Sequence, residues 1–164
     1  MIRNATWDDL AEIVAIYNAA IPGRLATADT EAVSVDSRHS WFQDHEPSHH
    51  PLWVYEDGQV VGWLSLNTFY ARSAFDETAE VSLYITPHRQ RGGLAKALLS
   101  QAIEQAPSLG LRTLLGLIFS HNQPSLRLFH NFGFEVWGRL PRVCVLDGVQ
   151  RDVMILGRHV GSKD

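Results

Sequence analysis

A basic, glycine-rich turn at residues 90–95 is the part of this sequence whose residue types indicate chemistry most directly. The turn reads QRGGLA, follows an apolar β-branched run, and precedes an amphipathic run that predicts a helix over residues 93–106. Small residues at a helix N-terminus leave successive backbone N–H groups uncovered, and that end of a helix carries about half a positive charge. Arg89 and Lys96 flank the turn and add formal positive charge. A phosphate or pyrophosphate site is therefore predicted at Gln90, Arg91, Gly92, Gly93, Leu94 and Ala95.

Several interpretations of this turn imply different classes of protein. A P-loop is excluded because G-x-x-x-x-G-K-[ST] does not occur, and a Rossmann fingerprint is excluded because G-x-G-x-x-G is absent. From the turn alone, a helix start that uses glycines without binding an anion remains an open alternative. The surroundings favour binding, because the turn fits Q/R-x-x-G-x-G/A and directly follows a strand that ends in Leu83-Tyr84-Ile85.

Length and composition predict a single globular domain over residues 1–164. The 164 residues are 45% hydrophobic and 20% charged, which suffices for an ordinary core without a metal or a disulfide. A formal net charge of -4 argues against nucleic acid as the main partner. The first residues lack the basic and apolar regions of a signal peptide, and no apolar run approaches the ~20 residues of a membrane span. We therefore expect a cytoplasmic protein that does not contact a membrane.

The hydrophobic periodicity predicts a strand, two helices, three strands, a helix, a strand, a helix and two strands. Strands are expected at residues 1–5, 52–56, 59–67, 78–86, 113–119, 134–145 and 150–156. Helices are expected at residues 7–21, 36–45, 93–106 and 124–131. Asp-Gly pairs at 57–58 and 147–148 predict the tight turns of two hairpins. This order predicts an α/β sandwich around a mixed, mainly antiparallel sheet.

Four separated segments carry a more specific pattern. They read I-R-x-A-T, I-Y-N, P-L-x-V and A-R-x-A-[FY]-D-x-T-x-E-x-S-x-Y, at residues 2–6, 16–18, 51–54 and 71–84. Together with the turn, they resemble the GNAT superfamily of acyl-CoA-dependent N-acyltransferases, and more narrowly its phosphinothricin and methionine-sulfoximine N-acetyltransferase branch. The resemblance covers almost the whole chain. It implies a three-layer sandwich (α/β, or α+β) of about seven strands with helices on both faces.

The resemblance implies acetyl-CoA as co-substrate, its pyrophosphate held by backbone N–H groups of the turn. Leu83, Tyr84 and Ile85 would lie along the pantetheine arm, because in this fold their strand splays away from the next one. Asn122 would contact the pantetheine as well. Its alternative role is a helix cap before Pro124, and the two roles are compatible.

No metal is expected. His45, His49 and His50 cluster in the sequence, but their spacing is not a recognised metal-ligand pattern. We expect these three side chains to lie in a solvated loop.

Acetylation of an amine by a thioester needs a group that takes a proton from the ammonium form. Glu80 matches the family's glutamate and is the only acidic residue in 79–90, and its alternative role is an exposed strand residue. The backbone N–H of Ile85 or a neighbour could polarise the thioester carbonyl. The general acid is left unassigned, because Phe129 stands where the family has His or Tyr, and His130 points about 100° away on a helix.

Arg72, Phe75 and Asp76 match the family's segment beside the acceptor substrate. Arg72 could bind a substrate carboxylate through two hydrogen bonds, and its alternative role is a surface salt bridge. Two departures leave the acceptor undecided. Ala26-Thr27-Ala28 replaces a segment with an aromatic residue, and residues 146–150 lack the usual Lys and Trp.

The function expected from these observations is acetyl transfer from acetyl-CoA to the amine of a small amino acid or amino-acid analogue, by direct attack in a ternary complex. One alternative is a GNAT enzyme for another small amine or a protein N-terminus. Another is a non-catalytic, acyl-CoA-binding regulatory module. The family resemblance also implies a homodimer.

Overall fold

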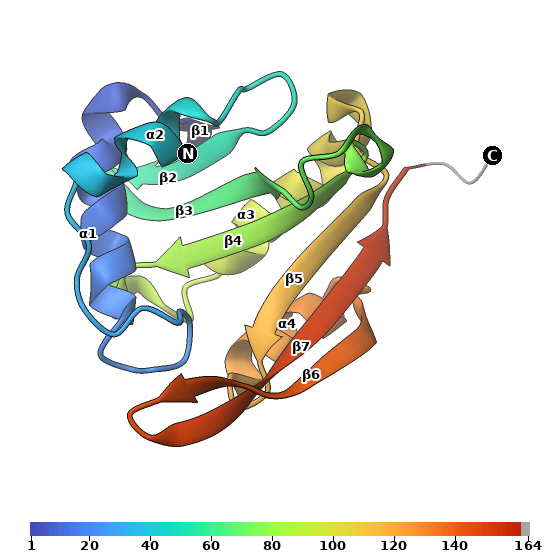
Figure 1. The fold of residues 1–164 in the computed structure, drawn as a ribbon. Coiled ribbons are helices and arrows are strands. Elements are labelled where there is room, and N and C mark those ends of the chain that lie inside the picture. The colour runs from blue at the N-terminus through green and yellow to red at the C-terminus, as the bar shows by residue number, and fades with distance from the viewer. Residues whose placement is uncertain (162–164) are drawn as a thin grey trace.

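The computed structural model describes residues 1–161, which contain a seven-stranded sheet with the strand order β1-β2-β3-β4-β5-β7-β6 (Figure 1). Neighbouring strands are antiparallel except β4 and β5, which are parallel. The expected mixed, mainly antiparallel sheet is therefore confirmed. The strands are β1 Ile2–Asn4, β2 Leu52–Asp57, β3 Gln59–Thr68, β4 Thr78–Ile85, β5 Thr113–Phe119, β6 Glu135–Leu146 and β7 Val149–His159.

Helices cover both faces of this sheet (Figure 1). One face carries α1 (Leu10–Ala20), preceded by a 3-10 turn, and α2 (His39–Gln43), preceded by a second 3-10 turn. The other face carries α3 (Leu94–Gln105) and α4 (Gln123–Asn131). The expected helix at residues 36–45 thus begins as a 3-10 turn and ends two residues early. The sandwich implied by the resemblance is confirmed.

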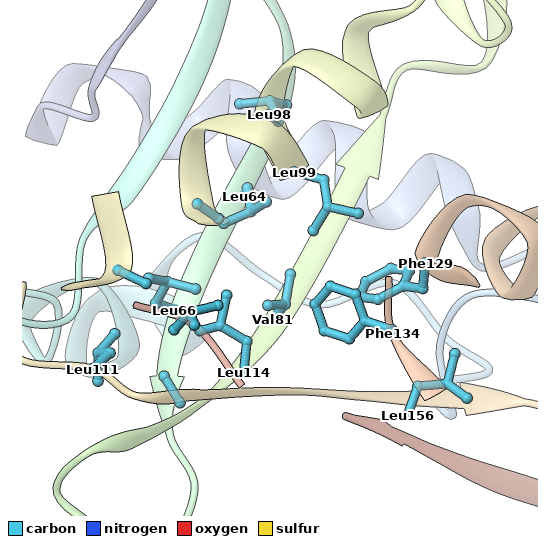
Figure 2. Close-up of a cluster of buried hydrophobic side chains, with 14 of the residues drawn as sticks. Leu64, Leu66, Val81, Leu98, Leu99, Leu111, Leu114, Phe129, Phe134 and Leu156 are labelled. Atoms are coloured by element: carbon cyan, nitrogen blue, oxygen red, sulfur yellow. The ribbon is translucent and has the colours of Figure 1, made fainter. Parts of the chain in front are cut away.

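The larger core lies between the sheet and the α3–α4 face (Figure 2). Leu98 and Leu99 of α3 are fully buried above Leu64 and Leu66 of β3. Burying side chains of this size stabilises the fold by about 1.5–3 kcal/mol each. This apolar layer holds α3 against the sheet and so fixes where the helix begins.

The opposite face has a smaller core with a strongly aromatic character. Trp63 of β3 donates from Nε1 to the carbonyl of Ile13 at 3.0 Å, which ties the sheet to α1. Its ring lies 5.4 Å from that of Trp41 in α2 and 4.8 Å from that of Tyr84 in β4. These rings occupy the space beneath the two helices and determine how closely α1 and α2 approach β4.

Strands β4 and β5 separate soon after they meet. Their register pairs Thr78–Glu80 with Thr113–Leu115, and no further pair joins them in residues 1–161. Figure 1 shows the two strands diverging from this point. The edge of Val81–Ile85 that faces β5 consequently has no strand partner in the described part of the chain. Backbone groups on this edge are free to bind another molecule.

The last hairpin is longer than expected. Strand β7 continues to His159, three residues beyond the expected end, because it pairs with β5 as far as the Thr113–His159 contact. Strand β6 forms the outer edge of the sheet and is exposed over most of its length. The hairpin turn uses Asp147 at φ +50° and Gly148 at φ +80°, as the Asp-Gly pair predicts.

Candidate functional site

The glycine-rich turn forms the N-terminal end of α3, as expected. Gly93 is the residue before the helix, with φ +82°, and no side chain caps it. In residues 1–161, the backbone N–H groups of residues 91–96 donate to no backbone or side-chain acceptor. A helix N-terminus with uncovered N–H groups attracts a phosphate oxygen through both hydrogen bonding and the helix dipole. The turn therefore fits a pyrophosphate.

One of the three cationic side chains around the turn already has a partner in the protein. Arg89 forms an ion pair with Asp57 in the β2–β3 turn, with 2.9 Å between Nη2 and Oδ2. Arg91 and Lys96 are exposed and form no ion pair within residues 1–161. Arg91 has φ +67°, which is unusual for a residue with a side chain. Two cations are thus available beside the uncovered N–H groups.

Leu83, Tyr84 and Ile85 lie on β4 beyond the point where it leaves β5. Leu83 and Ile85 pack on the α3 face, whereas Tyr84 packs on the α1 face. One edge of this segment pairs with β3, and the other faces the diverging β5. An extended molecule with amide groups could add along that edge in the manner of a strand.

Glu80 occupies the last position at which β4 and β5 are paired. Its side chain is half-buried, and burial raises the pKa of its carboxyl above the ordinary value. A carboxyl with a raised pKa accepts a proton more readily than a solvated one, which suits a general base. The side chain is therefore not an exposed strand residue, which was the alternative, and the role of Glu80 as base stays a prediction.

A polar network beside Glu80 was not found from the sequence. Asn67 of β3 lies opposite Glu80 and donates from Nδ2 to the Glu80 carbonyl at 3.2 Å and to Ser82 Oγ at 3.1 Å. Ser65 donates from Oγ to Asn67 Oδ1 at 3.2 Å, and His45 Nε2 lies 3.0 Å from the same oxygen. These contacts fix the β4 backbone at the point where the strands part.

The three histidines lie in a loop, as expected, but their side chains are half-buried rather than solvated. His45 Nδ1 lies 2.8 Å from the carbonyl of Trp41, and His49 Nδ1 lies 2.8 Å from that of Leu109. His50 is half-buried, and its Nε2 has no partner within residues 1–161. The His45 ring packs against that of Trp41 with centroids 4.8 Å apart, and the His49 and His50 rings pack on each other at 4.2 Å. No group of three or more His, Cys, Asp or Glu side chains in the described part of the chain is arranged to hold a metal ion.

Asn122 has the capping role that was one of its two expected functions. Its Oδ1 accepts from the N–H of Ser125 at 3.3 Å at the start of α4, and its Nδ2 donates to the carbonyl of Leu25 at 3.1 Å. His121 donates to the carbonyl of Arg24 at 2.7 Å, and Tyr84 donates to that of Ala26 at 3.0 Å. Residues 24–26 form a strap across the diverging strands. Contact of Asn122 with pantetheine stays a prediction.

Phe129 offers no proton donor at the position where the family has His or Tyr. The ring is buried, packs on Phe134 with centroids 4.9 Å apart, and lies against Gly116. A Cβ on Gly116 would stand 2.9 Å from Phe129 Cε1, so the glycine makes room for the ring. His130, the next residue, is exposed. The position serves packing.

Arg72, Phe75 and Asp76 lie in the exposed segment between β3 and β4, just before the strand that carries Glu80. Arg72 forms no ion pair within residues 1–161, so the alternative of a surface salt bridge is not observed there. The Phe75 ring lies 5.2 Å from that of Tyr70, and both rings are exposed. The segment presents a cation beside aromatic surface.

The sequence matches the Acetyltransferase (GNAT) family over residues 10–134, which include the turn, the diverging strands and Glu80. The chain belongs to this family. The protein is an enzyme, an N-acetyltransferase that uses acetyl-CoA. Within residues 1–161, no helix combines the length and the apolar character needed to cross a membrane.

Relatives with substrate names resemble this enzyme over nearly their full length. YwnH of Bacillus subtilis (strain 168), provisionally named a phosphinothricin acetyltransferase, is 46% identical over 161 residues, covering 97% of this chain and 98% of its own. The L-methionine sulfoximine/L-methionine sulfone acetyltransferase of Salmonella typhimurium is 33% identical over 156 residues, with coverage of 94% and 91%. The Salmonella typhimurium structure yncA, solved with its cofactor acetyl-CoA, superposes with a TM-score of 0.93 at 31% identity, covering 100% and 95%.

The turn allows a matched test of cofactor binding. Gly93 precedes α3, and Gly110 follows the 3-10 helix Ala106–Leu109 that comes after α3; their φ angles are +82° and +77°, and a Cβ on either would meet no atom within 4 Å. Gly93→Ala and Gly110→Ala should therefore each lower the free energy of unfolding by about 1–2 kcal/mol. Only Gly93→Ala should weaken the binding of acetyl-CoA, raising its Kd by about tenfold, because the added Cβ projects beside the uncovered N–H groups. Calorimetric titration measures both affinities, and equal Kd values would contradict the assignment.

Phe129 can be tested as a packing residue. Phe129→Leu should lower the free energy of unfolding by about 1–2 kcal/mol, because it leaves space beside Gly116 and Phe134. It should change kcat less than threefold, because no proton transfer is lost. Denaturant unfolding and steady-state thiol release measure the two effects. A large loss of kcat with unchanged stability would contradict this role.

Proposed function

We propose that this enzyme acetylates the α-amine of a small amino acid or amino-acid analogue by direct attack in a ternary complex with acetyl-CoA. The observation that carries the proposal is the half-buried carboxyl of Glu80 at the point where β4 leaves β5. The printed substrates of its relatives, methionine sulfoximine, methionine sulfone and phosphinothricin, are all amino-acid analogues. They support an acceptor of the same class here. We also propose that residues 1–164 act as one domain.

Acetyl-CoA supplies an activated thioester, and the turn and the β4 edge provide its binding groups. Backbone N–H groups of residues 90–95 bind the pyrophosphate, with Arg91 adding positive charge. Residues 83–85 receive the pantetheine along their unpaired edge, and Asn122 contacts the same arm. Because both regions are on rigid elements, they hold the reacting end at a fixed distance from the pyrophosphate.

Glu80 acts as the general base. An amino-acid amine is mostly ammonium at neutral pH, so it needs a proton acceptor before it can attack. The raised pKa of the Glu80 carboxyl favours proton uptake, and Asn67 holds the Glu80 backbone in place. The backbone N–H of Ile85 or a neighbour stabilises negative charge on the acetyl oxygen. No residue is assigned to protonate the leaving thiolate.

The acceptor lies at the start of β4. Arg72 binds its carboxylate, Phe75 provides an apolar wall, and Asp76 lies at the edge of the same segment. The exposure of Arg72 leaves its guanidinium accessible to a substrate. A GNAT enzyme for a protein N-terminus is the second candidate, and it would not depend on Arg72 in this way.

The enzyme acts in the cytoplasm as a homodimer. Exposed apolar side chains gather on β6 and at the start of β7, namely Val136, Trp137, Leu140, Val143, Val145 and Val149. An exposed edge strand with such a surface tends to associate with another chain. A second copy of this protein is the partner that this surface fits.

Replacing the base separates catalysis from binding. Glu80→Gln should lower kcat by roughly 100-fold or more, because the substituted amide cannot take a proton. The Kd of acetyl-CoA should stay within about twofold of wild type. Thiol-release kinetics and calorimetry provide the two values. If the wild-type protein binds acetyl-CoA but turns over none of a broad amine panel, it is a binding module and the proposal fails.

The pH dependence follows from the same carboxyl. Glu80 must be ionised to act, and its pKa is raised, so kcat/KM should fall as pH drops through a midpoint above 4.5. The same ascending limb should be absent in Glu80→Gln. A profile of kcat/KM between pH 4.5 and pH 8 tests this directly. An identical limb in both proteins would show that another group titrates.

The oligomeric proposal has its own control. Val145→Glu places a charge on the apolar β6 surface and should convert a dimer into a monomer. Trp7→Glu places a charge on an exposed aromatic residue near the opposite edge of the sheet and should leave the dimer intact. Sedimentation velocity gives both masses. A monomeric wild-type protein at tens of micromolar would refute the dimer.

A further inference from the structure

A cavity of about 190 Å³ lies between α1, the α2 region and β4. Of the residues assigned to the cofactor, only Tyr84 lines it. Four aromatic side chains line it, Tyr17 from α1, Trp41 from α2, and Trp63 and Tyr84 from the sheet. Ser82 lies in its wall as well. A cavity of this size could hold an amino-acid side chain of four or five heavy atoms.

One wall residue of the cavity, Ser82, lies two residues along β4 from the base. Glu80, Ser82 and Tyr84 alternate along β4, so their side chains lie on one face of the sheet. Residues two apart on a strand are separated by roughly 6.6 Å. An acceptor whose amine reaches Glu80 can therefore extend its side chain along β4 past Ser82 into the cavity.

One cation lines this cavity. The Arg38 guanidinium lies 4.9 Å from the centroid of the Tyr17 ring, and its Nη2 lies 3.4 Å from Asp29 Oδ2. Its remaining N–H groups have no acceptor within residues 1–161. Arg38 can therefore donate hydrogen bonds to an oxygen that enters the cavity.

The charge of Arg38 is already balanced. Tyr17 donates its hydroxyl hydrogen to Asp29, which keeps the Asp29 carboxylate beside the guanidinium. Burial raises the pKa of the Tyr17 and Tyr84 phenols, so both stay neutral at physiological pH. A second carboxylate would gain hydrogen bonds from Arg38 but would be repelled by Asp29. An uncharged oxygen would gain the same bonds without that repulsion.

We propose that this cavity is the side-chain subsite of the acceptor, and that Arg38 selects a side chain with an uncharged, strongly polar oxygen at its end. Sulfones and sulfoxides have this chemistry, whereas glutamate and phosphinate side chains carry an extra negative charge. The inference rests on the proposed acetylation of a small amino acid. Arg72 keeps the α-carboxylate, which all such acceptors share.

The test compares methionine sulfone, methionine and glutamate as acceptors at saturating acetyl-CoA. Wild-type kcat/KM should favour methionine sulfone over methionine by about tenfold, the worth of one charge-assisted hydrogen bond. Arg38→Met introduces a side chain of similar length without hydrogen-bond donors. It should abolish this preference, mainly by raising the KM for methionine sulfone. Asp29→Asn should raise kcat/KM for glutamate relative to the sulfone.

Two controls isolate the subsite. Arg72→Met should lower kcat/KM for methionine sulfone and methionine by the same factor, because both carry the α-carboxylate. Val33→Phe fills the cavity, and should reduce kcat/KM for methionine sulfone while leaving that for alanine within about twofold. The hydrogen bonds of Val33 to Asn18 involve only its backbone, so this variant keeps them.

The outcomes separate the two proposals. The subsite alone is overturned if the enzyme turns over amino acids but its preference for methionine sulfone survives Arg38→Met. It is also overturned if Val33→Phe lowers kcat/KM equally for alanine and methionine sulfone. Absence of turnover with any amino acid overturns the proposed function together with the subsite. The subsite is supported if Arg38→Met loses the preference for methionine sulfone while Arg72→Met keeps it, provided that the two variants have comparable melting temperatures.

Discussion

Parallel pairing between β4 and β5 extends over three residue pairs and then stops, and the site depends on that early stop. A fully paired β4 would have no free backbone edge, and Glu80 would lie in a continuous sheet. Apolar packing maintains the separation, because α3 lies under β4 and the Phe129 ring fills the space against Gly116 of β5. The core on the α3–α4 face therefore acts directly on the chemistry, by holding the two strands apart.

Polar contacts on the opposite face stabilise the same point. Asn67 binds the carbonyl of Glu80 and the hydroxyl of Ser82, and His45 lies against the same amide. The raised pKa of the Glu80 carboxyl has burial as its cause. The base thus depends on two separate features, a backbone held by Asn67 and a side chain partly withdrawn from water.

Local signals in the sequence predicted most of the fold. The expected strand at residues 113–119 has the observed bounds, and the glycine-rich turn begins α3 as its small residues indicate. The network around Asn67 was not predictable, because His45 lies 22 residues away and no local pattern joins them. The contacts of the strap join residues 97 positions apart, and the aromatic cavity depends on how closely α1 approaches the sheet. Such distances depend on packing, which a single sequence does not reveal.

Asn122 joins two separate parts of the structure through one short side chain. Its oxygen caps α4 and its nitrogen holds the carbonyl of Leu25, so the position needs an acceptor and a donor on one short side chain. Aspartate would preserve the cap and lose the hydrogen bond to Leu25, whereas alanine would lose both contacts. A single substitution at Asn122 would therefore disturb both the start of α4 and the segment over the diverging strands.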